Sequence, residues 1–440
     1  MVSYAFPVSL GVLVALYGAV VLRQLTGRGP PVAFLFLGAA FVLVVAGVLT
    51  PLQAALAVSY PVLALLLGMF LFVVALDRAG ALSHLAAWIA SRARRPEDLP
   101  LYLFLGMGLL STLILNDALA VLGVPLLLAL ARKLKVPPIP LLLTLAYAVT
   151  VGSVLTPLGN PQNLLVALDS GMPDPMGNFV LYLALPTAVN LVLGGWLLRR
   201  WFRSRMAASR QEFDRWRAEP PRLFPPGDWG SRLSRHPSVA IFPATLGVLL
   251  TFSIGGTLHL LPALPIEEIV LGGALIALLL EPGRKAIVLS VDYVTLLLFV
   301  GLFVVMAAEV QGGVVGVLAR ALSFSSPVQG HATPVGLGSF MLGTVGAVQV
   351  FSNVPWVALS IPLLTAQGYG STTVVAWLTL ASASTLAGNL TFLGAASNLI
   401  IVNQAERSGV RLRLGEFVRY GGPLTALTVV VTYLFLLFHL

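Results

Sequence analysis

The sequence predicts an all-α polytopic membrane protein made of two inverted repeats, each with a re-entrant helical hairpin and a broken transmembrane helix. Three observations predict this class: an apolar composition, basic residues confined to one side of the predicted membrane, and polar motifs that recur in both halves. Of 440 residues, 58% are hydrophobic and only 10% are charged. A water-soluble domain with this composition would expose most of its apolar surface, so we expect a bilayer around the chain.

The composition also excludes some kinds of chemistry. The chain has no cysteine, which rules out disulfides, thiolate metal sites and cysteine catalysis. The N-terminal Met1-Val2-Ser3-Tyr4-Ala5 carries no basic residue and the apolar run after it has no small-residue cleavage site, so we expect no removable signal peptide. A net charge of +9 would suggest nucleic acid in a soluble protein, but here the basic residues report membrane orientation, and no nucleic-acid partner is expected.

The predicted spans leave the basic residues on one side. With the first span running from outside to inside, every Lys and Arg except Arg320 falls in an inside segment, as the positive-inside rule requires. This holds only if two hairpins, 100–131 and 334–366, enter the membrane and return. The sequence therefore predicts a multi-pass protein of the cell (inner) membrane with both termini outside. The predicted spans are 5–23, 31–50, 57–77, 139–169, 178–198, 237–256, 266–280, 288–309, 371–405 and 415–438.

The two predicted repeats share more than their motifs. Leu65–Val74 resembles Leu296–Val305, and each run is followed by a carboxylate, Asp77 or Glu309, at a span end where we expect interfacial water to solvate it. Between the repeats, many arginines alternate with aromatic residues, which is typical of a linker lying on an anionic membrane surface. The predicted units are N-terminal spans 1–56, repeat 1 at 57–198, a basic cytoplasmic linker 199–237 and repeat 2 at 238–440.

Polar motifs interrupt the apolar sequence at matching places in both repeats, which in transporters marks the substrate site. A hairpin tip, Leu115-Asn116-Asp117 or Ser352-Asn353-Val354-Pro355, precedes a broken span, 139–169 or 371–405. Broken helices expose amides that attract anions and carbonyls that, with side-chain oxygens, coordinate Na⁺. The predicted substrate and coupling-ion residues are Asn116, Asp117, Thr156, Gly159, Asn160, Gln162, Asn163, Ser352, Asn353, Thr391, Gly394, Ser397 and Asn398.

Asp117 is the one carboxylate predicted well inside the membrane, where insertion costs roughly 2.5–3.5 kcal/mol. It either caps the following helix, as Asn116 could also do, or binds a cation or proton. No basic residue is predicted at that depth, so a permanent ion pair is not expected and the coupling role is favoured. For the asparagines of the motifs, plain interhelical hydrogen bonding is the alternative, but their place at symmetric breaks favours a binding site.

These four motifs resemble the ion-transporter superfamily, and within it the arsenite-permease and sodium/proton-antiporter group of anion permeases, with a distant similarity to divalent-anion/sodium symporters. The resemblance implies a scaffold domain that forms a homodimer, a transport domain that holds the hairpins and broken helices, and elevator-like movement. It also implies one possible Na⁺ site at Asn116, Asp117 and Gly159 and another at Asn353 and Gly394. The symporters carry Ser-Asn-Thr at both tips, and its absence here argues against a dicarboxylate substrate.

We therefore expect a secondary active transporter that moves a small inorganic ion or oxyanion, coupled to H⁺ or Na⁺, with no cofactor. A Na⁺/H⁺ antiporter is the first alternative, because a possible Na⁺ ligand set and a protonatable carboxylate occur together. A passive ion channel is the second, since paired hairpins alone do not exclude it. An intramembrane enzyme is disfavoured, because the chain has neither a His-Glu-x-x-His metal motif nor a Gly-x-Ser-x-Gly nucleophile turn.

Overall fold

The structure is a computed structural model that describes residues 4–26, 29–81, 84–85, 88–89, 92–218, 235–257, 260–261, 264–321 and 333–440. Within these ranges helices are the only regular elements, and six are long and apolar enough to cross a membrane. This confirms the predicted all-α polytopic class. The six helices are α1 (Ala5–Thr26), α4 (Tyr60–Arg78), α10 (Pro175–Ala207), α16 (Tyr293–Gln311), α18 (Pro334–Phe351) and α22 (Leu414–Leu437).

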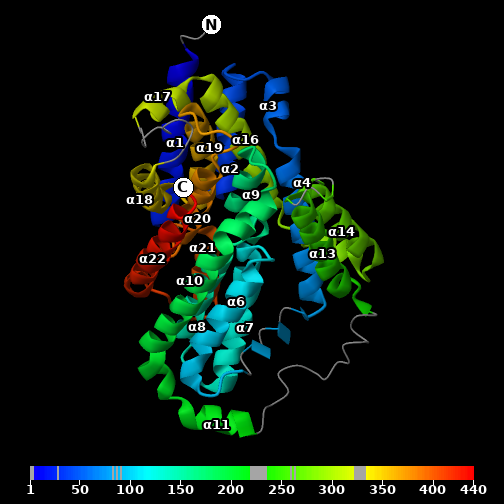
Figure 1. The fold of residues 1–440 in the computed structure, drawn as a ribbon, viewed down its shortest axis with the longest axis vertical. Helices are drawn as coiled ribbons and strands as arrows, with labels where there is room; N and C mark the ends of the chain where they lie inside the picture. The colour runs from blue at the N-terminus through cyan, green and yellow to red at the C-terminus, as the bar shows by residue number, and fades with distance from the viewer. Residues whose placement is uncertain are drawn as a thin grey trace.

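The helices that precede each hairpin exchange partners between the two halves. In the first half α4 packs against α14 of the second half, while α16 of the second half packs against α2 of the first. In Figure 1 α4, α13 and α14 lie together at the right, and α1, α2 and α16 lie together at the top. The remaining helices of this group are α2 (Val32–Val45), α3 (Pro51–Ala57), α13 (Ser238–Thr257), α14 (Ile266–Leu280) and α15 (Arg284–Leu289), and α17 (Val314–Ala321) follows α16.

Two pairs of helices occupy the predicted hairpins. The 13 residues of the first helix, α6, cover about 20 Å at ~1.5 Å per residue, which is shorter than a hydrocarbon core of about 30 Å. Figure 1 places α6 and α7 in the lower half of the molecule and α18 and α19 in the upper half, as expected for hairpins that enter from opposite sides. The first hairpin is α6 (Leu99–Ser111) with α7 (Asn116–Leu134), preceded by a short turn η1 (Pro96–Asp98); the second is α18 with α19 (Asn353–Ala366).

Both predicted broken spans consist of two half-helices. In the first, Pro157 and Pro161 lack the N–H that a continuous helix needs, and Asn160 caps the second half by accepting a hydrogen bond from the Asn163 amide at 2.8 Å. The half-helices of one repeat pack on the hairpin of the other: α21 on α7, and α9 on α19. The half-helices are α8 (Pro138–Gly152) and α9 (Pro161–Asp169), joined through η2 (Pro157–Gly159), and α20 (Val374–Ala387) and α21 (Ala396–Arg407).

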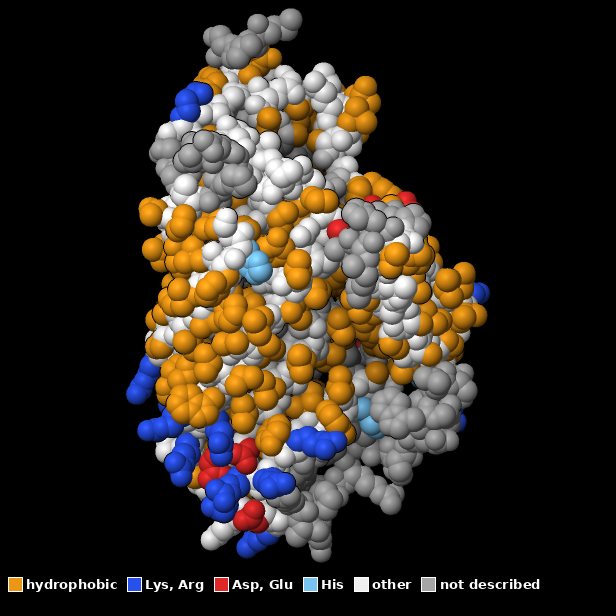
Figure 2. Space-filling model, viewed as in Figure 1, with side chains coloured by type: hydrophobic (Ala, Val, Ile, Leu, Met, Phe, Trp, Pro, Cys, Tyr) orange, Lys and Arg blue, Asp and Glu red, His pale blue; other side chains and the backbone are white. Residues whose placement is uncertain are grey.

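The region predicted as a linker begins as helix. α10 continues to Ala207, and α11 (Arg210–Ala218) follows it directly, while the rest of the predicted linker, including Phe224-Pro225-Pro226, lies outside the described residues. Figure 2 shows Lys and Arg gathered at the end of the molecule that carries α11, below a broad belt of hydrophobic side chains. This distribution agrees with a membrane around the belt and a basic surface on one side of it.

Candidate functional site

The first hairpin tip lies between the break of its own half and the second broken helix. The Thr156 hydroxyl donates a hydrogen bond to the carbonyl of Thr112, which ends the first hairpin helix. Asn116 Nδ2 lies 3.5 Å from Ser397 Oγ in the first turn of α21. Because α21 belongs to the other half, the tip joins residues that are far apart in sequence.

Two glycines bring the first hairpin close to the first broken helix. A Cβ atom at Gly152 would lie 1.9 Å from the carbonyl oxygen of Gly108, so α6 and α8 meet backbone to backbone. A Cβ atom at Gly159 would lie 2.9 Å from the carbonyl oxygen of Ser111, at the end of α6. Side chains at either glycine would therefore separate the hairpin from the break.

The second hairpin tip repeats this arrangement on its own break. The Asn353 amide donates to the Gly394 carbonyl at 3.1 Å, and Ser352 Oγ lies 3.5 Å from the same oxygen. Thr391 donates to Gln349 Oε1 at 2.8 Å, which is the counterpart of the bond that Thr156 makes in the first half. Both tips are thus held by a threonine of the adjacent break.

Ser352 carries backbone strain at the second tip. Its φ of 66° and ψ of 162° belong to a region that is essentially reserved for glycine. A residue there costs on the order of 1–3 kcal/mol, and such strain clusters at functional sites. Ser352 must hold this conformation because it ends α18 and immediately precedes α19.

Thr385 of α20 connects the second broken helix to the first. Its hydroxyl accepts hydrogen bonds from Asn160 Nδ2 at 3.3 Å and from Gln162 Nε2 at 3.2 Å, and it lies 3.1 Å from Asn163 Oδ1, to which it donates. All four side chains are buried. Three of the predicted site residues therefore meet at one hydroxyl of the other half.

Two asparagines fasten the broken helices across their gaps. Asn163 Nδ2 donates to the Ser153 carbonyl at 2.9 Å, and Asn398 Nδ2 donates to the Gly388 carbonyl at 2.7 Å. Each bond joins the start of the second half-helix to the residue just beyond the end of the first. The alternative of plain structural hydrogen bonding therefore holds for the amide nitrogens, but it does not account for every oxygen.

At the first hairpin tip and the two breaks, four buried amide oxygens have no hydrogen-bond partner among the described residues: Asn116 Oδ1, Gln162 Oε1, Asn389 Oδ1 and Asn398 Oδ1. Leaving one such acceptor unpaired costs about 1–3 kcal/mol. Amide and carboxylate oxygens are the ligands that hard cations prefer. Asn116 contacts Ser397, the residue before Asn398, so the oxygens of Asn116 and Asn398 both lie at the first tip and suit a Na⁺ site.

Asp117 supplies a carboxylate beside these oxygens. The helix α7 begins at Asn116 without any side-chain cap, so the alternative that Asn116 or Asp117 caps it is wrong. Instead, the Asp117 carboxylate faces the backbone amide of Ser397 at the N-terminus of α21, where a negative charge is favoured. Among the described residues no ion pair involves Asp117.

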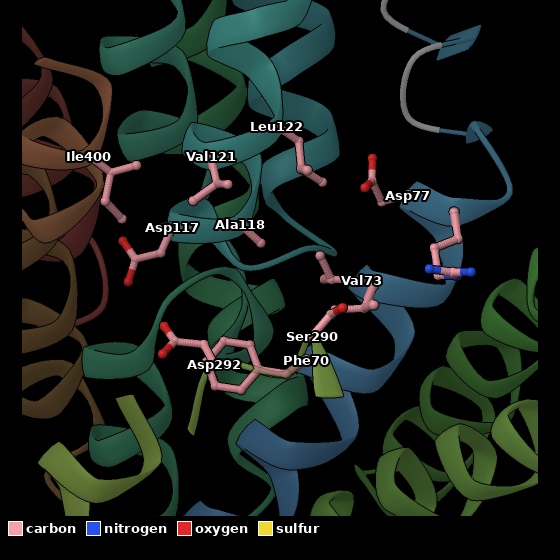
Figure 3. Close-up of a pocket in the computed structure, with 12 residues that line it drawn as sticks. Phe70, Val73, Asp77, Asp117, Ala118, Val121, Leu122, Ser290, Asp292 and Ile400 are labelled. Atoms are coloured by element: carbon pink, nitrogen blue, oxygen red, sulfur yellow. The ribbon is translucent and has the colours of Figure 1, made fainter. Parts of the chain in front are cut away.

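A cavity of about 310 Å³ opens beside Asp117, and we call it the acidic cavity. Asp117 and Ile400 line it from α7 and α21, Asp292, which precedes α16, lies on the same side as Asp117, and Asp77 of α4 lies across from them (Figure 3). Asp292 caps α16 by accepting the Thr295 amide at 3.1 Å, so its charge is also held in place. Arg78 also lines the cavity, but the three carboxylates outnumber it and favour entry of a cation.

A second cavity, of about 400 Å³, borders the second break, and we call it the basic cavity. Phe392 and Leu393 of the break line one part of it. Arg23, Arg411 and Arg413 line another part, together with Glu406. The arginines outnumber the carboxylate, so this cavity favours anions.

Glu309 corrects an expectation from the sequence. Its side chain is fully buried and neither carboxyl oxygen has a hydrogen-bond partner among the described residues, so the predicted solvation at a span end is wrong. It is enclosed because α1, α17 and α19 all pack on α16. Asp77 is exposed, as expected, and lines the acidic cavity.

Sequence reasoning missed Thr385, Gln349, Thr112 and Asn389. Thr385 precedes Thr391 by the same interval that separates Thr150 from Thr156, so a stricter alignment of the repeats would have found it. Gln349 and Thr112 hold equivalent positions before the two tips, but they differ in residue type, and no pattern in the sequence marks them.

Each of the two inverted hairpins packs on the broken helix of the other half, and buried polar groups lie between them. This arrangement defines a membrane transporter of the broken-helix class. The chain belongs to the citrate transporter family, whose sequence profile matches residues 19–387. This confirms the predicted placement in the ion-transporter superfamily.

Several curated relatives are transporters by name. An uncharacterized transporter of Mycobacterium tuberculosis is 28% identical over 385 residues, covering 86% of each chain. The silicon efflux transporter LSI3 of rice is 26% identical over 468 residues, covering 91% of this chain and 93% of its own. The protein is therefore a membrane transporter of this family.

Two solved transporters share the fold. The YdaH transporter of Alcanivorax borkumensis superposes with a TM-score of 0.51 at 16% identity, covering 89% of this chain and 86% of its own. MtrF of Neisseria gonorrhoeae superposes with a TM-score of 0.53 at 13% identity, covering 99% of this chain and 95% of its own. At these identities the similarity concerns the fold alone.

Proposed function

We propose that the protein is a secondary active transporter that moves a small inorganic ion or oxyanion, of the arsenite and anion-permease type, coupled to H⁺ or Na⁺. The observation that carries this proposal is the group formed by Asp117 and the unpartnered oxygens of Asn116 and Asn398. The rice relative supports the solute class, because its name states the export of silicon, a small inorganic solute.

The coupling ion binds at the first tip. Asn116, Asp117 and Asn398 offer amide and carboxylate oxygens next to the start of α21. The same carboxylate can carry a proton instead of holding Na⁺, so either ion can couple. The acidic cavity gives the ion a path to Asp117 that is lined by further carboxylates.

The solute binds at the second tip. The residue that occupies the place of Asp117 there is Val354, so the adjacent N-terminus of α9 faces no carboxylate and keeps its partial positive charge. The basic cavity raises the local concentration of anions next to Thr391 and Gly394. The coupling cation thus binds at the first tip and the anionic solute at the second, and the cavities beside the two tips carry opposite charge.

The helices α2, α4, α14 and α16 form the scaffold in this proposal, and the hairpins and broken helices form the moving unit. The scaffold pairs with that of a second copy, and the moving unit travels as an elevator. The protein lies in the inner membrane with both termini outside, since the basic end that carries α11 then faces the cytoplasm.

A Na⁺/H⁺ antiporter is the second candidate, and the three carboxylates of the acidic cavity favour it. Under that alternative Na⁺ would drive proton movement without any anion. A passive channel would conduct the solute regardless of the coupling ion. Transport assays distinguish both of these alternatives from the proposed coupled transporter.

Purified protein in proteoliposomes, with imposed Na⁺ or pH gradients, tests the proposal against silicate, arsenite, phosphate, sulfate and citrate. We expect gradient-driven movement of at least one of the small oxyanions or oxyacids. Asp117→Asn should abolish the gradient dependence, whereas Asp77→Asn, which removes an exposed carboxylate of the same cavity, should retain it. Both variants should keep the unfolding temperature of the wild type within a few degrees.

Four outcomes would contradict the proposal. Transport of citrate alone would overturn the solute class, and Na⁺-driven proton movement without any solute would establish the second candidate. Normal coupling in Asp117→Asn would remove Asp117 from its role. Solute flux that ignores both gradients would indicate a channel.

A further inference from the structure

Arginines from three elements converge on one pocket at the basic end of the molecule. The pocket has a volume of about 310 Å³ and lies where α10 passes the turn η1 and meets the start of α11. None of the site residues described above lines it. We call it the arginine pocket, and it is lined by Arg95, Glu97, Trp196, Arg199, Arg200, Arg203 and Arg210.

The charge in the arginine pocket is not balanced. Arg199 pairs with Asp98, with Nε and Oδ1 2.8 Å apart, and this is the one ion pair that the described residues give to a lining arginine. Glu97 is the single carboxylate in the lining, against five arginines. The pocket therefore keeps a surplus of positive charge that suits an anionic group.

Glu97 adds a second requirement. Its Oε2 atom is buried and has no hydrogen-bond partner among the described residues. A ligand that fits this pocket must therefore combine an anionic group for the arginines with a hydrogen-bond donor for Glu97. Hydrogen phosphate and a phosphodiester whose headgroup carries a hydroxyl both meet these two requirements.

The depth of the pocket indicates where such a ligand comes from. Trp196 is 54% exposed and lies about one helical turn before Arg199 and Arg200 on α10. One further turn away, Val192 is 57% exposed on an apolar surface. Tryptophan concentrates at the membrane–water interface. Val192 therefore lies at the depth of the acyl chains, Trp196 at the interface, and the arginines at the depth of the headgroups.

We propose that the arginine pocket binds the phosphate of an anionic phospholipid from the adjacent leaflet, with a headgroup hydroxyl donating to Glu97. The guanidinium fork matches the geometry of phosphate oxygens, and a glycerol headgroup supplies the hydroxyl. The acyl chains then lie along the exposed apolar face of α10, on the Val192 side of Trp196. A lipid bound here bridges η1, α10 and α11, and so fixes the start of the connection between the two halves.

Native mass spectrometry of the full-length protein with phosphatidylglycerol, phosphatidylcholine or inorganic phosphate tests this proposal. We expect retention of phosphatidylglycerol over phosphatidylcholine, and at least a tenfold weaker affinity in the double variant Arg200→Gln with Arg203→Gln. The matched control, Arg284→Gln with Lys285→Gln, removes two exposed charges of α15 that do not line the pocket and should bind as the wild type does.

Equal losses in both double variants would overturn the proposal, because they would indicate diffuse attraction to the basic end. Phosphate binding without any preference for phosphatidylglycerol would assign the pocket to a soluble anion instead. If the double variant does not fold, quenching of tryptophan fluorescence by brominated phosphatidylglycerol decides. The wild type should then lose more fluorescence than Trp196→Phe, and equal quenching would refute the pocket.

Discussion

Gly152→Ala should separate the first hairpin from its broken helix. A Cβ atom at this position would lie 1.9 Å from the carbonyl oxygen and 2.4 Å from the carbonyl carbon of Gly108, whereas ordinary contacts begin at 3.4 Å. All obstructing atoms are backbone, so no side chain can turn away and the helices α6 and α8 must move apart by more than an ångström. Overpacking costs about 1–3 kcal/mol, and a purely backbone obstruction at 1.9 Å lies at the upper end of that range. After a helix-propensity gain of about 1 kcal/mol, we expect a net loss of about 2 kcal/mol.

Thermal unfolding of the purified protein in detergent measures this loss. Gly346→Ala is the matched control, because Gly346 lies in the first helix of the second hairpin and no atom would approach its Cβ within 4 Å. We expect a lower unfolding temperature for Gly152→Ala and an unchanged or higher one for Gly346→Ala. Since α6 leads to Thr112, transport should also fall in Gly152→Ala at temperatures where it is folded. An unfolding temperature equal to that of the wild type would refute the close backbone contact.

Three further substitutions have defined expectations, each checked by thermal unfolding in detergent. Ser352→Gly should stabilise the fold by about 1–3 kcal/mol, because glycine adopts the observed φ without strain; a lower midpoint would contradict the strained tip. Asn398→Leu should destabilise it by about 1–3 kcal/mol by leaving the buried Gly388 carbonyl unpaired, and an unchanged midpoint would mean that this bond contributes nothing. Glu309→Gln should unfold at or above the wild-type temperature at pH 8, since a buried carboxylate without a partner is costlier than an amide; a marked loss would reveal a partner for the carboxylate.

The hairpins and breaks could be predicted from the sequence because their signals are local. Proline and glycine interrupt apolar runs at Pro157, Pro161 and Gly388, and such interruptions stop a helix wherever the rest of the chain lies. The predicted limits of the broken spans agree with the half-helices within a few residues. The limits of the spans outside the hairpins could be predicted less accurately, since α10 extends well beyond its predicted end at 198.

The partners of the site residues could not be predicted in the same way. The resemblance paired Asn116 with Gly159, and the structure does place Gly159 against the first hairpin, but the side chain of Asn116 faces Ser397 of the other half. Which residues face each other across the halves depends on how four separate helices pack, and one sequence contains no signal for it. The burial of Glu309 was missed for the same reason, because the helices that enclose it are distant in the chain.

Each hairpin packs on the broken helix of the other half, so the site is completed late in biosynthesis. The resting place of the first tip, α21, begins at Ala396, so Asn116 and Asp117 enter the bilayer long before their neighbours leave the ribosome. Until the last tenth of the chain is made, these polar groups face lipid, water defects or the insertion machinery. Truncation after the first half would therefore leave a nascent chain with an unshielded carboxylate, and the two halves mature together or not at all.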